Sequence, residues 1–224
     1  MQSSTSIGGT LSVHKIGVPK APLSWRVQNT LRWTFLWGWF TVQLAKAFSK
    51  LTGITTISSE LRLRKNVGGT VIRNADGTVH YVRGGEWIDY GVVSRRLVTN
   101  NGVAFLVDAW QNIVELENMK YHGCGTSSTA ESASDSALGA ESTTILNPDS
   151  TRATGTQSEA SANQLVSAGT LTFDGSGAIV EHGLLSQAAT GGGVLWDRSV
   201  FSAVNVSSGD SILFTYTATF TSGG

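Results

Sequence analysis

The stretch GVLWDRSVFSAVNVSSGDSILFTYTATF, residues 193–220, indicates the fold class most directly. Its second half alternates between large apolar side chains and threonines, and a period of two is that of a β-strand. Threonine also favours the extended backbone because it is branched at Cβ. We predict two neighbouring strands separated by a turn at residues 207–210. The second strand would place one face in the core (Ile212, Phe214, Tyr216, Ala218, Phe220) and offer the other, rich in threonine, to water or to another copy.

The same signals recur from Leu61 onward. Residues 68–85 read as a hairpin that turns at 74–77, and residues 86–99 and 102–110 read as strands of a meander that reverses at 100–102. Residues 167–173 and 178–185 read as a further pair of strands around a turn at 174–177, whereas residues 113–122 fit a strand or a short helix. Charged residues are scarce and only three prolines occur, which is typical of all-β domains. The predicted fold is mainly β, with a β-sandwich or jelly-roll body.

The N-terminal region differs sharply from this pattern. LSWRVQNTLRWTFLWGWFTVQLAKAFSKL, residues 23–51, holds four of the seven tryptophans. At helical spacing its large apolar residues share one face and its polar ones the other, which predicts an amphipathic helix. The apolar face would be Trp33, Leu36, Trp37, Phe40, Leu44, Ala47, Phe48 and Leu51, and the polar face Arg32, Gln43, Lys46 and Lys50. Alternating aromatic residues at 33, 35, 37 and 39 leave a strand as the alternative.

We interpret this region as an arm that anchors the protein to a partner, because clustered aromatic and basic side chains are typical of protein interfaces. The proposed anchor residues are Trp25, Arg26, Arg32, Trp33, Trp37, Phe40, Lys46 and Lys50. Two alternatives stay open: a helix that covers the protein's own sheet, and one that lies on a membrane surface. A membrane span is not expected, because only 13 uncharged residues separate Arg32 from Lys46.

Charge is distributed unevenly along the chain. Residues 1–65 hold nine Lys or Arg against one acid, whereas residues 66–224 hold seven bases and 15 acids, so the net charge is zero. This distribution favours an anionic partner for the arm, although a solvated set of charges would give the same pattern. We expect no sequence-specific contact with nucleic acid.

Residues 125–164 are dominated by Ser, Thr, Ala and Gly. They read either as a disordered linker or as loops held on the β scaffold. We favour loops because the segment contains apolar residues that can anchor it, namely Ala137, Leu138, Ile145 and Leu146. The expected organisation is an arm over residues 1–60 and a β body over residues 61–224. A division of the body into a meander over 61–122 and half a sandwich over 123–224 is the alternative.

No group of residues points to catalysis. His122 and Cys124 lack further ligands nearby in the sequence, and the remaining histidines lie in separate segments. Glu181 and His182 would point to opposite faces of a strand, and Asp197 with Arg198 reads as an ordinary surface ion pair. Neither a dinucleotide-binding motif nor a P-loop is found. We therefore expect a protein that is not an enzyme and that needs no metal or cofactor.

From about Leu97 onward the chain resembles a group of structural proteins from tailed-bacteriophage virions. The resemblance is carried by RLVTNNGVAFLVDAW, MKYHGCGTSSTAESASDSALGAE and RATGTQSEASANQ, and most specifically by EHGLLS, LWDRSVFSAVNV and GDSILFTYTATF. It implies a non-catalytic particle component. The single cysteine, Cys124, allows no intramolecular disulfide, which fits assembly in the host cytoplasm. The arm does not take part in the resemblance.

Within a virion, we expect a capsid decoration or cement protein that binds assembled capsomers. A neck or tail component is the alternative, and receptor binding has less support. The expected partners are the major capsid protein or other virion proteins. We also expect the chain to form a homo-oligomer, and we favour a trimer.

Overall fold

The computed structural model describes residues 19–52, 54–68, 70–73, 79–83 and 85–222 of the 224-residue chain. It is mainly β, as predicted, with two antiparallel sheets, a separate hairpin and three helices. The helical elements are α1 (Leu23–Leu31), α2 (Trp33–Thr52), α3 (Asn100–Trp110) and a single 3-10 turn, η1 (Leu116–Asn118).

The larger sheet has the strand order β4-β1-β11-β8-β7, and the smaller has the order β10-β9-β5-β6. The strands of the larger sheet are β4 (Glu86–Leu97), β1 (Thr56–Val67), β11 (Ser211–Thr221), β8 (Gln164–Thr172) and β7 (Thr156–Ser161). Those of the smaller sheet are β10 (Leu195–Val206), β9 (Gly177–Leu185), β5 (Tyr121–Gly125) and β6 (Ala153–Thr154). Strand β1 begins at Thr56, so a boundary after residue 60 falls within a central strand of the larger sheet.

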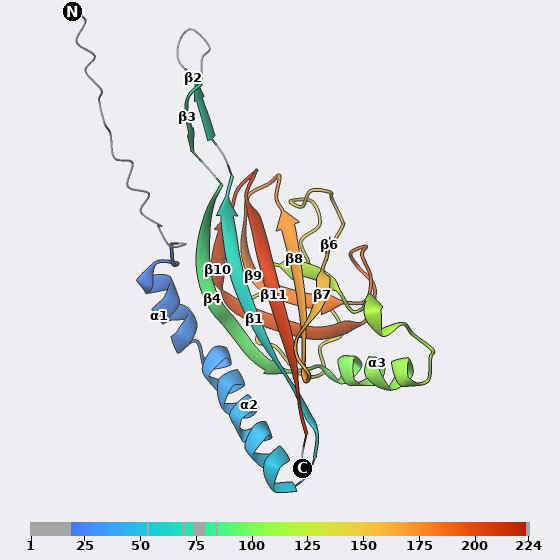
Figure 1. Ribbon diagram of the computed structural model, residues 1–224. Helices are drawn as coiled ribbons and strands as arrows, with labels where there is room; N and C mark the ends of the chain where they lie inside the picture. Colours follow the sequence, from blue (N-terminus) through green and yellow to red (C-terminus); the bar gives the residue numbers. More distant parts are fainter. Residues whose placement is uncertain (1–18, 53, 69, 74–78, 84, 223–224) are drawn as a thin grey trace, which may run out of the picture.

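The predicted hairpin of residues 68–85 is present as β2 (Thr70–Arg73) and β3 (Val79–Arg83), which pair antiparallel. Its predicted turn at 74–77 lies outside the described residues. The hairpin continues from β1 and β4 and extends beyond the end of the two sheets (Figure 1).

Strand β11 supplies much of the core, with the orientation that its alternation predicts. Ile212, Phe214, Tyr216 and Ala218 are fully buried, and Phe220 is half-buried at the end of the strand. The threonine face stays partly exposed. Across the core, the rings of Phe214 and Phe201 of β10 lie 6.3 Å apart. The alternation therefore predicted the orientation of the strand correctly.

Residues 102–110, predicted as a strand, form most of helix α3 instead. The hydroxyl of Thr99 accepts a hydrogen bond from the Gly102 N–H at 3.0 Å, which caps the first turn of the helix. With this cap in place, Gly102 and Phe105 face the body and Val103 and Val107 face away. The Asn-Asn-Gly sequence that suggested a reversal between two strands opens a helix, so the predicted meander is wrong.

Two pairs of strands that the sequence predicts to be neighbours lie in different sheets. Strand β8 pairs with β11 and β7, whereas β9 pairs with β10 and β5, so the turn at 174–177 connects the two sheets. Likewise β10 and β11 lie in different sheets. Each of these strands has an apolar face, and placing consecutive strands in different sheets turns those faces towards one shared core.

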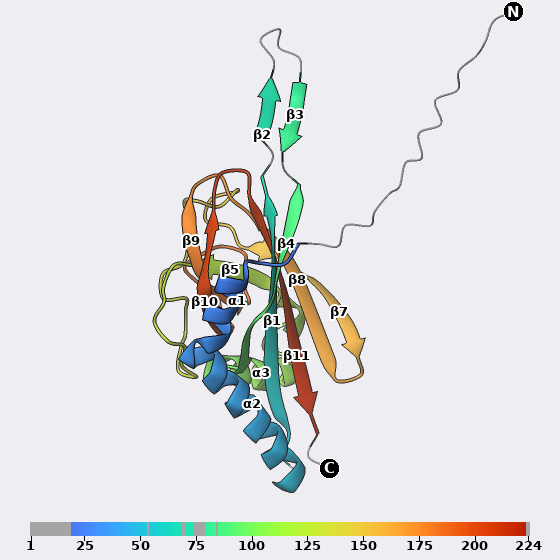
Figure 2. The same cartoon turned by 90° about the vertical axis from the view of Figure 1, so that its left-hand side faces the viewer.

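The arm contains two helices instead of the single predicted one. Helix α1 ends at Leu31, where Arg32 takes an extended conformation (φ −58°, ψ 132°) before α2 begins. Both helices lie along the outside of the β body (Figures 1 and 2).

The Ser/Thr-rich segment 125–164 forms loops and short strands on the body, as favoured from its sequence. Leu138 and Leu146 are buried as expected. Buried charges hold it as well: the carboxylate of Glu181 on β9 accepts the backbone N–H groups of Gly139 and Ala140 at 2.9 and 2.7 Å. This segment is therefore pinned by residues distant in the sequence.

Candidate interaction surface

Helix α2 presents two different faces. Its contact with the sheet uses Phe35, Gly38, Val42 and Ser49, which are buried and recur at helical spacing. A Cβ atom on Gly38 would overlap the backbone carbonyl oxygen of Arg95 on β4. The helix thus approaches the sheet through a face that combines Phe35 and Val42 with the small residues Gly38 and Ser49.

Most of the large apolar residues of α2 point away from the body. We call the row that they form the α2 ridge, and its members are Phe40 (50% exposed), Leu44 (56%), Phe48 (54%) and Leu51 (85%). Leu36 and Trp37 extend the same row, with the rings of Trp37 and Phe40 5.9 Å apart. The predicted apolar face exists, but it is not the face that covers the protein's own sheet.

Trp25 and Arg32, two predicted anchor residues, bind the protein's own body. The indole N–H of Trp25 donates to the Ala203 carbonyl oxygen at 2.8 Å, and the Arg32 guanidinium donates to the Phe201 carbonyl oxygen at 2.8 Å. The Trp25 ring also packs edge-on against Tyr90, with centroids 4.6 Å apart. Both residues therefore lock α1 and the start of α2 to the body.

A break in the smaller sheet explains these contacts. The β10–β9 ladder is interrupted between Val200 and Val204. Backbone groups in this break pair with the arm instead, because the N–H of Ser202 donates to the buried Asn29 side chain at 2.8 Å. Polar backbone groups that leave a ladder need other partners, and α1 supplies them.

The other predicted anchor residues are distributed around the ridge. Phe40 belongs to it, and Arg26 and Lys50 are exposed. Lys46 is half-buried beside the sheet, in a small depression that Glu60 and Arg95 also line. Helix α2 begins at Trp33, whose side chain lies outside the described part of the chain.

A buried histidine pair was not recognised from the sequence. His122 Nδ1 and His182 Nε2 lie 2.9 Å apart, and His122 Nε2 lies 2.9 Å from the Ser167 hydroxyl. All three side chains are buried, and burial lowers the pKa of His122 to about 3. The two histidines come from β5 and β9, which are paired strands 60 residues apart, so nothing in their local spacing could have revealed them.

Asp197 and Arg198 do not form the predicted surface ion pair. Both are buried, and they point to opposite sides of β10. Asp197 accepts a hydrogen bond from Ser59 at 2.6 Å, and burial raises its pKa to about 7. Arg198 donates to Glu181 at 2.7 Å and to Asp135 at 3.0 Å. Cys124 is likewise buried, which raises the pKa of its thiol to about 12.

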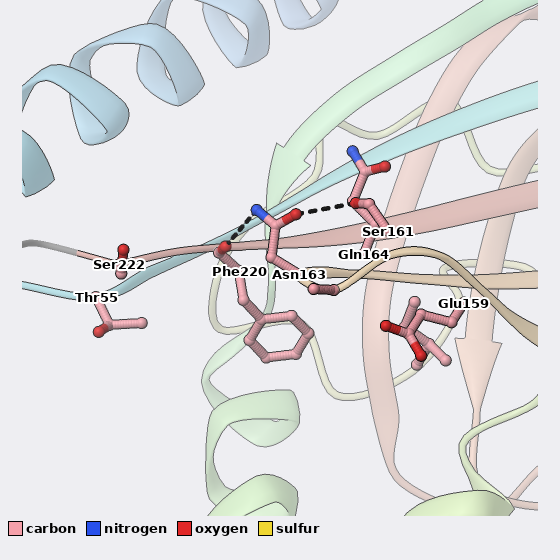
Figure 3. A pocket seen from close by; sticks show the side chains of 9 residues that line it. Thr55, Glu159, Ser161, Asn163, Gln164, Phe220 and Ser222 are labelled. Carbon is pink, nitrogen blue, oxygen red and sulfur yellow. Dashed lines mark hydrogen bonds between the residues drawn. The ribbon is translucent and has the colours of Figure 1, made fainter.

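A shallow cavity of about 470 Å³ lies where β11 ends beside the β7–β8 turn (Figure 3). Its polar groups bind one another: Ser161 donates to Asn163 at 2.9 Å, and Asn163 donates to the Phe220 carbonyl oxygen at 3.0 Å. Glu159 is the one titratable side chain among the described residues that line it. The cavity therefore offers no pair of groups suited to acid–base chemistry.

Within the described residues, no three His, Cys, Asp or Glu side chains are placed to hold a metal ion. None of the described helices combines the length and hydropathy needed to cross a bilayer. Comparison with protein-family models, curated proteins and solved structures finds no match. The α2 ridge is a row of large apolar side chains that the described part of the chain leaves exposed.

Proposed function

We propose that this chain is a non-enzymatic structural protein of a tailed-bacteriophage virion, in which it decorates the capsid. The proposal draws on the resemblance of residues 97–220 to virion proteins, and the observation that carries it is the exposed α2 ridge. We also infer that the two sheets form a β-sandwich, with a jelly roll as its more specific form. The facing rings of Phe201 and Phe214 support this arrangement.

The α2 ridge supports an assembly role because α2 is apolar on two opposite sides. A helix on the surface of a protein normally buries one apolar stripe and presents polar residues to water. Here the stripe of Phe35 and Val42 is covered by the sheet, while Phe40, Leu44 and Phe48 are about half exposed. Large contiguous apolar surfaces of this kind mark interfaces between proteins. The ridge is therefore the surface that we expect another virion subunit to cover.

The stabilising effect would follow from mass action. A protein that binds the assembled shell, but not its separated subunits, shifts the equilibrium towards the shell. This role requires an interface and no reacting groups.

Quantifying the protein in purified virions tests the proposal. A decoration protein should be present in a copy number comparable with that of the major capsid protein, and a particle map should place it on the outer shell. A copy number comparable with that of the portal would instead indicate the neck or tail. Absence from purified particles would overturn the virion assignment altogether.

A further inference from the structure

Helix α3 and the segment that follows it form a second exposed apolar surface. Val103, Val107 and Trp110 recur at helical spacing on the side of α3 opposite to the buried Phe105, and Trp110 is 82% exposed. Ile113 and Leu116, in the segment that follows α3, are exposed as well. We call these five residues (Val103, Val107, Trp110, Ile113, Leu116) the α3 face.

The two chain segments that hold these apolar surfaces differ in the sign of their charged residues. Residues 19–52, which hold the α2 ridge, contain five bases and no acid: Lys20, Arg26, Arg32, Lys46 and Lys50. Residues 100–119, which hold the α3 face, contain three acids and no base: Asp108, Glu115 and Glu117. Lys50, Glu115 and Glu117 are exposed, so they can form a polar rim around an apolar contact.

The two surfaces also lie on opposite sides of the molecule. Helix α2 packs on β4 of the larger sheet, whereas α3 packs against β10 of the smaller one. In Figure 1 the two helices lie on either side of the β body, and in Figure 2, seen from the α2 side, α3 lies behind the sheet. One copy therefore cannot cover its own α3 face with its own α2 ridge.

We propose that the α2 ridge of one copy docks on the α3 face of the next copy, so that the chain assembles head to tail. This inference rests on the proposed function, because it names the partner that covers the ridge. An interface between two different surfaces closes into a ring when the rotation between copies allows it and otherwise continues as an open array.

Charge favours this pairing over its alternatives. Contact between two ridges would bring together two segments whose charged residues are all basic. Contact between two α3 faces would bring together two segments whose charged residues are all acidic. Facing like charges raise the free energy of such complexes, whereas ridge-to-face contact places opposite charges around the apolar centre.

Three matched substitutions in the full-length protein test the proposal. Leu44→Glu places a carboxylate in the centre of the ridge, Val107→Glu does the same in the α3 face, and Thr170→Glu adds the same group at an exposed site on β8. All three positions are exposed in the monomer, so the variants should melt near the wild-type temperature. Association would be measured by analytical ultracentrifugation over a range of protein concentrations.

We expect wild type and Thr170→Glu to form oligomers, and each of the other two variants to raise the dissociation constant at least about tenfold. Mixing Leu44→Glu with Val107→Glu is the decisive step. Each variant keeps one intact surface that the other lacks, so an equimolar mixture should form dimers and nothing larger. If Val107→Glu alone still forms wild-type oligomers, the α3 face is not the partner and the inference is wrong.

A wild-type protein that stays monomeric at high concentration would also overturn the inference. Flotation of such a monomer with anionic vesicles would indicate that the ridge binds a lipid surface instead. These results are separable from the proposed function: a monomer found at capsid copy number in virions contradicts only the inference, whereas a head-to-tail oligomer absent from virions contradicts only the virion role.

Discussion

Asp197 illustrates how strongly the fold changes the chemistry of a single residue. It is fully buried on β10, where it accepts a hydrogen bond from Ser59, and Arg96 and Glu131 are the nearest charged groups that influence it. Burial raises its pKa from 3.8 to about 7. The folded state therefore holds a proton that the unfolded state releases between these two pH values, so the contribution of Asp197 to the free energy of unfolding falls as pH rises from about 4 to about 7.

We predict that Asp197→Asn abolishes this decrease in the free energy of unfolding. The difference between 3.8 and about 7 corresponds to about 4 kcal/mol, so the variant should gain up to that amount over wild type at pH 8 and almost nothing at pH 4. Urea unfolding across this pH range measures the effect. A constant difference between the two proteins at every pH would contradict the assigned ionisation.

The pair His122–His182 should act in the opposite direction. Burial lowers the pKa of His122 to about 3 and that of His182 well below 6.5, so the unfolded state binds protons that the folded state excludes. The contribution of the two histidines to the free energy of unfolding should therefore fall as pH drops from 6.5 towards 3.

We predict that His182→Gln makes the acid-induced decrease in the free energy of unfolding less steep by about 1.4 kcal/mol per pH unit, which is the contribution of one bound proton. The slope is the relevant readout, since the absolute stability also changes with the packing of His182 against Phe214. Urea unfolding of wild type and His182→Gln between pH 4 and 6.5 measures it. An unchanged slope would show that His182 does not titrate on unfolding.

At the scale of elements, the position of α2 depends on Gly38. The helix approaches β4 so closely at this point that a side chain would meet the Arg95 carbonyl oxygen. The approach fixes which side of α2 faces the sheet and hence the direction of the ridge.

We predict that Gly38→Ala destabilises the protein by about 1–3 kcal/mol, although alanine is the better helix former, because the helix must move away from the sheet. Ala47→Ser, at an exposed position on the same helix, should change stability by about 0.5 kcal/mol or less. Chemical denaturation of both variants checks the prediction. A stabilised Gly38→Ala protein would show that α2 does not depend on the close contact.

The elements also show where sequence patterns mislead. The alternation of β11 predicted its buried face, because a period of two has one structural meaning in a strand. The run 102–110 is apolar except for Asp108, and so short a run does not distinguish a strand from a helix. Its cap, Thr99, decides in favour of the helix.

At the scale of the whole molecule, charged residues distant in the sequence hold the Ser/Thr-rich segment on the sheets. Glu181 on β9 binds Arg198 on β10 and the backbone of Gly139 and Ala140. Arg152 binds Glu141 at 2.6 Å and the carbonyl oxygen of Gln187 at 2.9 Å. These interactions replace the apolar core that the segment is too polar to form.

We predict that Glu181→Gln costs about 3–5 kcal/mol, because it leaves the buried Arg198 without its closest counter-charge. Hydrogen exchange at the amides of Gly139 and Ala140 should accelerate at the same time. Glu159→Gln, on the exposed strand β7, is the matched control and should have little effect. Normal protection of these amides in Glu181→Gln would mean that other contacts hold the segment.

The sequence by itself determined the β class, the buried face of β11, the helical arm and the polar character of the 125–164 loops. Each of these depends on composition or on the period of a local pattern. The tertiary structure alone decided which side of α2 meets the sheet, that Trp25 and Arg32 bind the break in β10, and that His122 meets His182. These features depend on close backbone approaches and on strand pairing between distant residues, so no local pattern encodes them.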